Sequence, residues 1–331
     1  MTPPIPDPAR ILLVALDNLG DLVFASALTP PLRAAYPNAV IDVWCRAYTA
    51  PVAALLPNVS SVIAADPFWS AAANRPRPRI LPFLRAMAAV RRGRFDVAVL
   101  SEAPWRTAAA VAATRIPVRI GLARHRNAAF LTHVLPAANA AKPVLTEQAR
   151  LLSALGIASP HPRYRLDATP LRSRRDDLSR HLPPRFAALH PFAASRSRCL
   201  PLPEWTALAL ALQSRDLPVL WIGTAGELDE LRSLRTHPPG TYVDQLGDGS
   251  LSTTAAALSL ASLFVGHDSG PLHVAGALGV PVVGVFAPGQ PERTFPQGIG
   301  PSRLVHRATP QEIDAAMILR AIDALLLSSA E

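Results

Sequence analysis

Short runs of hydrophobic residues recur along the chain, separated by longer stretches in which apolar positions repeat at helical spacing. The runs are continuously apolar, which is typical of strands buried on both faces of a parallel sheet. Strands and helices that alternate in this way predict βαβ units. The runs that we predict as strands are residues 11–16, 40–44, 61–64, 97–100, 118–120, 186–190, 219–222, 242–243, 263–265 and 282–286.

A proline-rich, charged stretch between residues 159 and 184 interrupts the alternation, which restarts at residue 186. This break predicts an α/β protein with two Rossmann-like domains, each built on a parallel sheet. The expected segments are a first domain at 1–168, a linker at 169–184, a second domain at 185–309 and a C-terminal amphipathic helix at 310–331.

The most distinctive stretch is a polar loop, Gly266 to Gly270, that follows a predicted strand and leads into a helix at Pro271. Free N–H groups and the positive end of the helix dipole make such a corner an anion site. Asp268 and Ser269 could instead only cap the helix. Two glycines and a proline at one corner favour the anion site over a simple cap.

A second polar loop, residues 17–21, follows the first predicted strand and ends at Asp21, where a helix begins. Gly20 would allow a tight or positive-φ turn. Asp21 is either a general base or merely an N-cap. No GxGxxG motif is present, so a dinucleotide-dependent hydride transfer is not supported. Ligands bind at the carboxyl ends of parallel strands, so we expect loops 17–21 and 266–270 to face one another across a cleft.

Two further loops follow predicted strands of the second domain. Hydroxyl and guanidinium groups gather at residues 195–198, which suits a phosphate, although a solvated basic loop would look similar. Glu227 opens a helix after a glycine turn. Its carboxylate could accept from a ribose hydroxyl or could simply favour the helix dipole.

The net charge of +9 predicts an anionic partner, such as a nucleotide, a phosphorylated glycan or a membrane face. No zinc-finger spacing and no aromatic-interleaved RNA motif is present, so nucleic acid is not favoured. The two cysteines, Cys45 and Cys199, cannot build a disulfide framework, which fits a reducing cytoplasm. No signal peptide, transmembrane segment or metal-ligand cluster is evident, so we expect a cytoplasmic protein without a metal, in peripheral contact with a membrane at most.

Three stretches together resemble glycosyltransferase family 9, which contains the lipopolysaccharide heptosyltransferases. Residues 11–43, ILLVALDNLGDLVFASALTPPLRAAYPNAVIDV, resemble its N-terminal strand–GD–helix–strand block. Residues 190–205, HPFAASRSRCLPLPEW, are similar to its donor loop. Residues 251–288, ending in VGHDSGPLHVAGALGVPVVGVFAP, resemble its "GNDTGPMHLAAALGTPVVALFGP" signature.

The resemblance implies a GT-B fold of two facing Rossmann-like domains, with the helix at 310–331 packing back on the N-terminal domain. It implies inverting, metal-independent transfer from a nucleotide sugar, with ADP-heptose the expected donor, to a lipopolysaccharide or related glycan. The N-terminal domain would bind this anionic glycolipid acceptor at the inner membrane face, and the C-terminal domain would bind the donor. No cofactor besides the donor is implied.

The resemblance also assigns roles to individual residues. Asp21 falls on the proposed base of the family, with Asn18 and Gly20 on the acceptor side. The residues that fall on donor-binding positions are Ser195, Arg198, Glu227, Asp268, Ser269 and Gly270. Backbone N–H groups of the last three would hold the diphosphate, and Arg198 takes the place of a lysine.

The chain departs from the family pattern at several of these positions. Ala15 stands where many members have a basic residue, Asp17-Asn18 replaces Ser-Ser, and Phe192 replaces the glycine of the donor loop. These changes bear on the donor and the acceptor more than on the fold. Two other hypotheses therefore stay open, a non-catalytic nucleotide-sugar or glycan-binding protein and a sugar-nucleotide epimerase, which would need further carboxylates.

Overall fold

The computed structural model describes residues 3–70, 78–234 and 238–327 of the chain. Contacts between residues divide it into two compact units, Met1–Tyr164 and Arg165–Glu331. Each unit is built on one six-stranded sheet, and all strand pairs within both sheets are parallel. The prediction of two Rossmann-like domains with parallel sheets is therefore confirmed.

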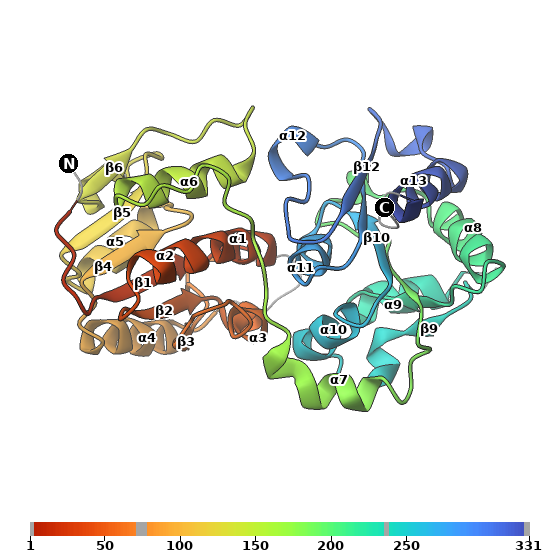
Figure 1. Ribbon diagram of the computed structural model, residues 1–331, viewed down its shortest axis with the longest axis horizontal. Helices are drawn as coiled ribbons and strands as arrows, with labels where there is room; N and C mark the ends of the chain where they lie inside the picture. Colours follow the sequence, from red (N-terminus) through yellow and green to blue (C-terminus); the bar gives the residue numbers. More distant parts are fainter. Residues whose placement is uncertain (1–2, 71–77, 235–237, 328–331) are drawn as a thin grey trace. The chain divides into compact units, whose positions relative to one another are not determined.

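Unit 1 has the strand order β3-β2-β1-β4-β5-β6 (Figure 1). Its strands are β1 (Arg10–Ala15), β2 (Val40–Cys45), β3 (Ser61–Ala64), β4 (Val97–Leu100), β5 (Val118–Leu122) and β6 (His133–Leu135). Its α-helices are α1 (Leu19–Ala25), α2 (Thr29–Ala35), α3 (Ala50–Ala53), α4 (Ile80–Arg92), α5 (Trp105–Ala113) and α6 (Val144–Ala154).

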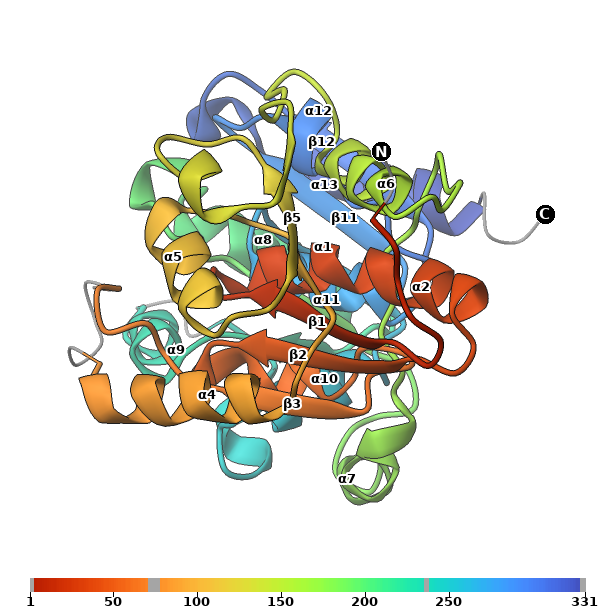
Figure 2. The same cartoon turned by 90° about the vertical axis from the view of Figure 1, so that its left-hand side faces the viewer.

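Helices cover both faces of the unit 1 sheet (Figure 2). On one face, Phe83 and Val90 of α4 and Val111 of α5 pack into a core with Leu12 and Trp44. On the other face, α1 lies over β1, and α6 packs on α1 and β5. The central strands are buried on both sides, which explains why their sequences are continuously apolar.

Unit 2 has the equivalent strand order β12-β11-β10-β7-β8-β9. Its strands are β7 (Ala187–His190), β8 (Val219–Trp221), β9 (Thr241–Tyr242), β10 (Leu263–His267), β11 (Val282–Phe286) and β12 (Ser302–His306). Its α-helices are α7 (Arg172–Leu178), α8 (Leu202–Gln213), α9 (Ala225–Arg232), α10 (Leu251–Leu258), α11 (Gly270–Ala277), α12 (Pro291–Thr294) and α13 (Ala315–Leu327).

The segment expected to be a linker, 169–184, contains α7, and α7 packs against α10. Arg174 of α7 pairs with Asp248 across 3.2 Å. The C-terminal helix α13 packs on α8, β11 and β12 of unit 2, where Arg215 pairs with Asp323 across 2.7 Å. Its expected return to the N-terminal domain stays a prediction. No helix within the three described ranges has both the length and the apolar character needed to cross a membrane.

The order of the strands defines one ligand-binding position in each sheet. Chain connections run in opposite directions on either side of the β1/β4 pair and of the β7/β10 pair. Loops that leave such a pair at its carboxyl end diverge, and the gap between them is where α/β proteins bind ligands. The predicted loops at 17–21 and 266–270 follow β1 and β10, so each lies at the switch point of its own unit.

Candidate active site

The switch point of unit 2 is formed by the corner between β10 and α11. Ser269 is the N-cap residue, and α11 begins at Gly270 with a proline in its first turn. Gly266 pairs with His190 of β7, and an added Cβ at Gly266 would lie 2.7 Å from the ring of Phe264. Glycine at this position therefore lets the two strands and the aromatic ring pack closely beneath the corner.

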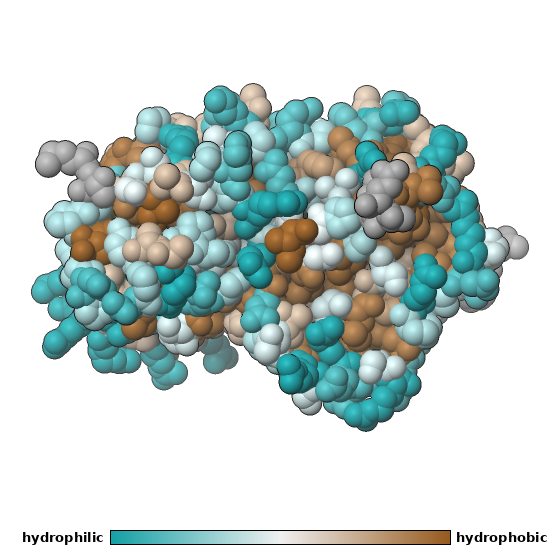
Figure 3. Space-filling model, in the orientation of Figure 1, coloured by the Kyte–Doolittle hydropathy of each residue, from teal (hydrophilic) through white to brown (hydrophobic). Residues whose placement is uncertain are grey.

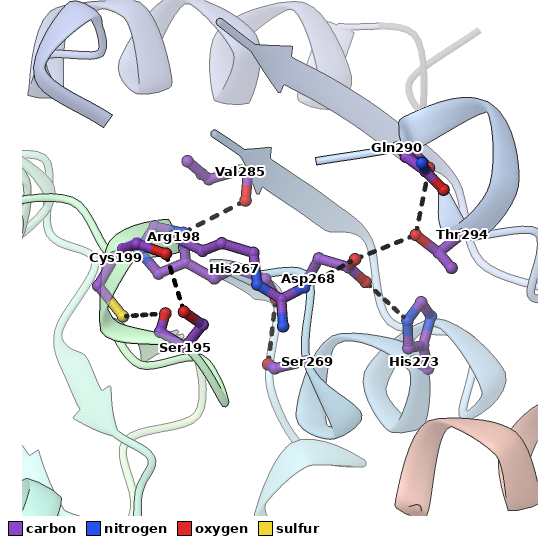
Figure 4. Close-up of polar contacts among 11 residues, drawn as sticks. Ser195, Arg198, Cys199, His267, Asp268, Ser269, His273, Val285, Gln290 and Thr294 are labelled. Carbon is purple, nitrogen blue, oxygen red and sulfur yellow. Dashed lines mark hydrogen bonds and ion pairs between the residues drawn. The ribbon is translucent and has the colours of Figure 1, made fainter. Parts of the chain in front are cut away.

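Asp268 is the centre of a polar network at this corner (Figure 4). Its Oδ1 lies 3.3 Å from Nε2 of His273, and its Oδ2 accepts a hydrogen bond of 3.1 Å from the hydroxyl of Thr294. Arg198 approaches the same carboxylate to 3.7 Å. Burial acts to raise the pKa of Asp268, but His273, Thr294 and Arg198 outweigh it and hold the pKa below its ordinary value. The carboxylate is therefore held in its charged form.

Arg198 lies at the end of a short 3₁₀ helix, Arg196–Arg198, in the loop that follows β7. The guanidinium points toward Asp268, and 34% of the side chain remains exposed. Its neighbour Arg196 instead forms an ion pair with Glu230 and stacks over the ring of Phe192, which is buried. The phenylalanine that replaces the family glycine thus packs under the loop, and Arg198 is the arginine that faces the network.

Ser195 precedes this 3₁₀ helix, and its Oγ lies 2.8 Å from Oγ of Ser197. Ser269 donates a hydrogen bond of 3.1 Å to the carbonyl of His267 and lies 3.1 Å from Nδ1 of His190. Of the residues assigned to the donor, the structure thus brings Arg198 and Asp268 into contact beside the first turn of α11.

Glu227 lies on another element, the first turn of α9 after β8. Its Oε2 accepts hydrogen bonds of 2.8 Å from both the main-chain N–H and the hydroxyl of Thr224. The residue therefore completes a capping box, in which N-cap and third helical residue satisfy each other. This agrees with the alternative that Glu227 stabilises the start of a helix. A contact between Glu227 and a ribose stays a prediction.

Two buried histidines were missed by sequence reasoning. His267 Nε2 accepts a hydrogen bond of 3.1 Å from the main-chain N–H of Leu200, and its Nδ1 faces the carbonyl of Val285 at 3.3 Å. Burial lowers the pKa of His267 to about 4, and burial has the same effect on His190. The sequence held one indication of a special role for His267, because this residue takes the place of asparagine in the family signature.

In unit 1, the predicted residues occupy the start of α1. Asn18 is the N-cap residue, and its main-chain N–H donates a hydrogen bond of 3.0 Å to Oδ2 of Asp21, the third helical residue. Asp21 is therefore not the N-cap. Gly20 belongs to the first helical turn and is not among the glycines with positive φ. The expected turn at Gly20 is wrong, because the helix begins at Leu19, two residues before Asp21, and includes Gly20.

Glu102, which sequence reasoning missed, joins Asp21 at this switch point. It follows β4 and pairs with Arg124 across 2.8 Å. The side chain of Asn127 joins the loop after β4 to the end of β5. Its amide donates hydrogen bonds of 2.8 Å to the carbonyls of Ala103 and Leu122. Burial, reinforced by the charges of Asp21 and Asp17, raises the pKa of Glu102 to about 7.

The two units thus carry different chemistry at their switch points. Unit 1 presents carboxylates, which can accept a proton. Unit 2 presents Arg198 and the N-terminus of α11, which can bind an anion. In the part of the chain that the structure describes, no three His, Cys, Asp or Glu side chains form a group that could hold a metal ion.

Several known proteins are similar to this chain. Lipopolysaccharide heptosyltransferase 3 of Escherichia coli is 23% identical over 279 residues, which cover 81% of this chain and 80% of the relative. A glycosyl transferase family 9 structure from Veillonella parvula superimposes with a TM-score of 0.80 at 18% identity, covering 97% of each chain. The E. coli heptosyltransferase WaaC with ADP gives a TM-score of 0.75 at 17% identity, covering 96% of this chain and 99% of that one.

These superpositions extend over nearly the whole chain and assign it the GT-B fold. Residues 83–312, which include β4 of unit 1 and the corner between β10 and α11 of unit 2, match glycosyltransferase family 9 (heptosyltransferase). The match covers more than half of the chain. The protein is therefore a member of glycosyltransferase family 9, the heptosyltransferase family.

Proposed function

We propose that this enzyme transfers a heptose-like sugar from ADP-heptose to a lipopolysaccharide or related glycan, with inversion at the anomeric carbon and without a metal ion. The observation that carries the proposal is the contact between Arg198 and Asp268 at the head of α11. It orients a guanidinium beside the N-terminus of α11, and both groups favour a diphosphate. WaaC with ADP and the name of the E. coli relative support the choice of nucleotide and acceptor.

In the proposed reaction, Asp21 takes the proton from an acceptor hydroxyl as its oxygen attacks the anomeric carbon. The bond from that carbon to the diphosphate oxygen breaks, and the nucleoside diphosphate leaves with the electron pair. Arg198 and the main-chain N–H groups of Ser269 and Gly270 stabilise the charge that develops on the leaving oxygen. Asp268 holds Arg198 in position, and the residues of the donor corner (Ser195, Ser269 and Gly270) line the diphosphate.

The acceptor side of the proposal rests on unit 1, where Asn18 and Gly20 lie in the same helix start as Asp21. Ala15 ends β1 and is buried. It offers no charge to a phosphorylated acceptor, which favours an acceptor unlike that of relatives with a basic residue there. We propose that the enzyme works at the inner membrane face, where a glycolipid acceptor would be exposed to the cytoplasm.

A panel of ADP-, GDP-, UDP- and dTDP-sugars tests the choice of donor. A ligand well above its dissociation constant raises the melting temperature, so ADP-heptose should give the largest rise. A largest rise with another nucleotide would contradict the proposed donor. Release of ADP in the presence of a lipopolysaccharide core acceptor then separates transfer from binding alone, and binding without release would favour the non-catalytic alternative.

A further inference from the structure

Helix α4 of unit 1 exposes hydrophobic residues on the face that points away from the sheet. Its inner face buries Phe83 and Val90 in the core. On the outer face, Ile80, Leu81 and Leu84 have 48, 61 and 46% of their surface exposed. Scattered exposed leucines need no explanation, but three large apolar side chains on one turn of helix form a patch.

The apolar surface continues from α4 onto its neighbours. Phe68, which precedes α4 in sequence, is 44% exposed, and its ring lies 5.9 Å from that of Phe83. Trp105, at the start of α5, is 39% exposed. Phe68, Trp69 and Trp105 line an open cavity of about 310 Å³ that also reaches Met87. The patch therefore includes an aromatic recess between α4 and α5.

Exposed arginines lie on α4 beside this apolar surface. Between Asp66 and Asp96 the sequence has seven arginines and no acidic residue. Arg85, Arg91 and Arg92 are exposed on α4, and no ion pair engages any of them within the described ranges. In Figure 3, hydrophilic side chains predominate along the lower left edge of unit 1, where Figure 1 places α4.

We propose that this surface docks unit 1 onto an anionic phospholipid bilayer. We define the α4 patch as the apolar residues Phe68, Ile80, Leu81, Leu84 and Trp105 with the flanking arginines Arg85, Arg91 and Arg92. Leucine and aromatic side chains beside arginines are the composition of interfacial helices, in which apolar groups enter the acyl boundary and arginines contact lipid phosphates. The absence of carboxylates from this stretch of sequence favours a negatively charged partner.

This inference deepens the proposed function, because a glycolipid acceptor is anchored in a membrane. Docking through α4 would raise the local concentration of the acceptor near the enzyme. It concerns a helix outside both switch points, so membrane binding and sugar transfer can be measured separately.

Co-sedimentation of the full-length protein with vesicles tests the inference. The protein should bind vesicles of phosphatidylglycerol and phosphatidylethanolamine, and it should bind pure phosphatidylcholine vesicles at least tenfold less. Raised salt should weaken the binding, because it screens the charge contribution. Equal binding to both vesicle types, or no binding to the anionic vesicles, would overturn the proposal.

Two variants locate the binding surface. Leu81→Ser/Leu84→Ser removes apolar contact, and Arg85→Gln/Arg91→Gln/Arg92→Gln removes charge without altering the buried face of α4. Each should reduce the bound fraction on anionic vesicles at least fivefold. Unchanged binding by both variants would assign the contact to another surface and refute the α4 patch.

Matched controls come from exposed residues of unit 2. Leu210→Ser/Leu304→Ser removes two exposed leucines, of which 55 and 40% of the surface is accessible, and should leave vesicle binding unchanged. A calorimetric titration with ADP should give wild-type affinity for the α4 variants. Loss of vesicle binding by the α4 variants with intact ADP binding supports the docking surface. If neither the wild type nor any variant binds ADP, the result contradicts the proposed function instead.

Discussion

His267 Nε2 accepts a hydrogen bond of 3.1 Å from the main-chain N–H of Leu200, and this bond joins β10 to the end of the loop that carries Arg198. Because Nε2 is the acceptor, the ring proton lies on Nδ1 and points to the carbonyl of Val285. A neutral imidazole of one tautomer is needed for both contacts. His267 thus positions the loop that holds Arg198 beside Asp268.

Replacement of His267 by alanine should loosen this loop. The change leaves the N–H of Leu200 without its partner in a buried place, which costs about 2 kcal/mol of unfolding free energy. Affinity for ADP should fall roughly tenfold, because Arg198 is no longer held in position. Chemical denaturation and calorimetry measure the two effects. His306→Ala, at an exposed position of β12, serves as the control and should change neither.

The two buried histidines also predict how stability depends on pH. Burial lowers the pKa of His190 and of His267 to about 4, below the ordinary value of 6.5. The unfolded chain therefore binds more protons than the folded one between pH 6.5 and 4, so stability is complete above pH 6.5 and is lost as the pH falls. At pH 5 each histidine should lower the free energy of unfolding by about 2 kcal/mol relative to its value above pH 6.5. The test uses the Glu102→Gln variant, which lacks the opposing change from Glu102. A melting temperature of that variant that stays constant from pH 7 to 5 would argue against neutral buried histidines.

Glu102 predicts the opposite pH dependence over an overlapping range of pH. Burial raises the pKa of this carboxyl to about 7, above its ordinary 4.5, so the folded state keeps a proton that the unfolded state has lost. The protonated carboxyl of Glu102 contributes fully to stability below pH 4.5. The free energy of unfolding then falls as the pH rises toward 7. Glu102→Gln should therefore gain stability relative to wild type between pH 5 and 8. A difference between the two melting curves that does not change with pH would contradict this prediction.

Arg198 and Arg196 allow a matched test of donor binding within a single loop. Arg198 faces Asp268, whereas Arg196 pairs with Glu230. Arg198→Ala should weaken ADP binding by roughly 10- to 100-fold, because it removes a charge-assisted contact with the diphosphate. Arg196→Ala should weaken it less than threefold, on the order expected for an exposed ion pair. Calorimetry that finds the same loss for both would mean that the loop contributes only general positive charge.

The two strands that sequence reasoning missed are both edge strands. β6 (His133–Leu135) and β12 (Ser302–His306) each lie at one end of a sheet, and most of their side chains are partly or fully exposed. Continuous apolar runs identify strands that are buried on both faces, and an edge strand has no need of such a run. The central strands were predicted to within one or two residues for the same reason.

The candidate site was predictable where a residue follows a predicted strand. Asp21 and Asp268 were found because they follow β1 and β10 in recognisable loops. Glu102 also follows a strand, but its proximity to Asp21 depends on the pairing of β1 with β4, which no local pattern reveals. The bond between His267 and Leu200 likewise joins positions distant in sequence, so it required the structure.

In the proposed mechanism Asp21 accepts the proton in sugar transfer, and the turnover of Asp21→Asn tests this role most directly. Asparagine keeps the shape and can still accept from the N–H of Asn18, so the helix start should persist. The control Asp7→Asn changes an exposed carboxylate in the N-terminal segment. With ADP-heptose and a lipopolysaccharide core acceptor, kcat of Asp21→Asn should fall roughly 10³-fold with unchanged ADP affinity, whereas Asp7→Asn keeps wild-type kcat. Turnover of Asp21→Asn within a few-fold of wild type would contradict the account.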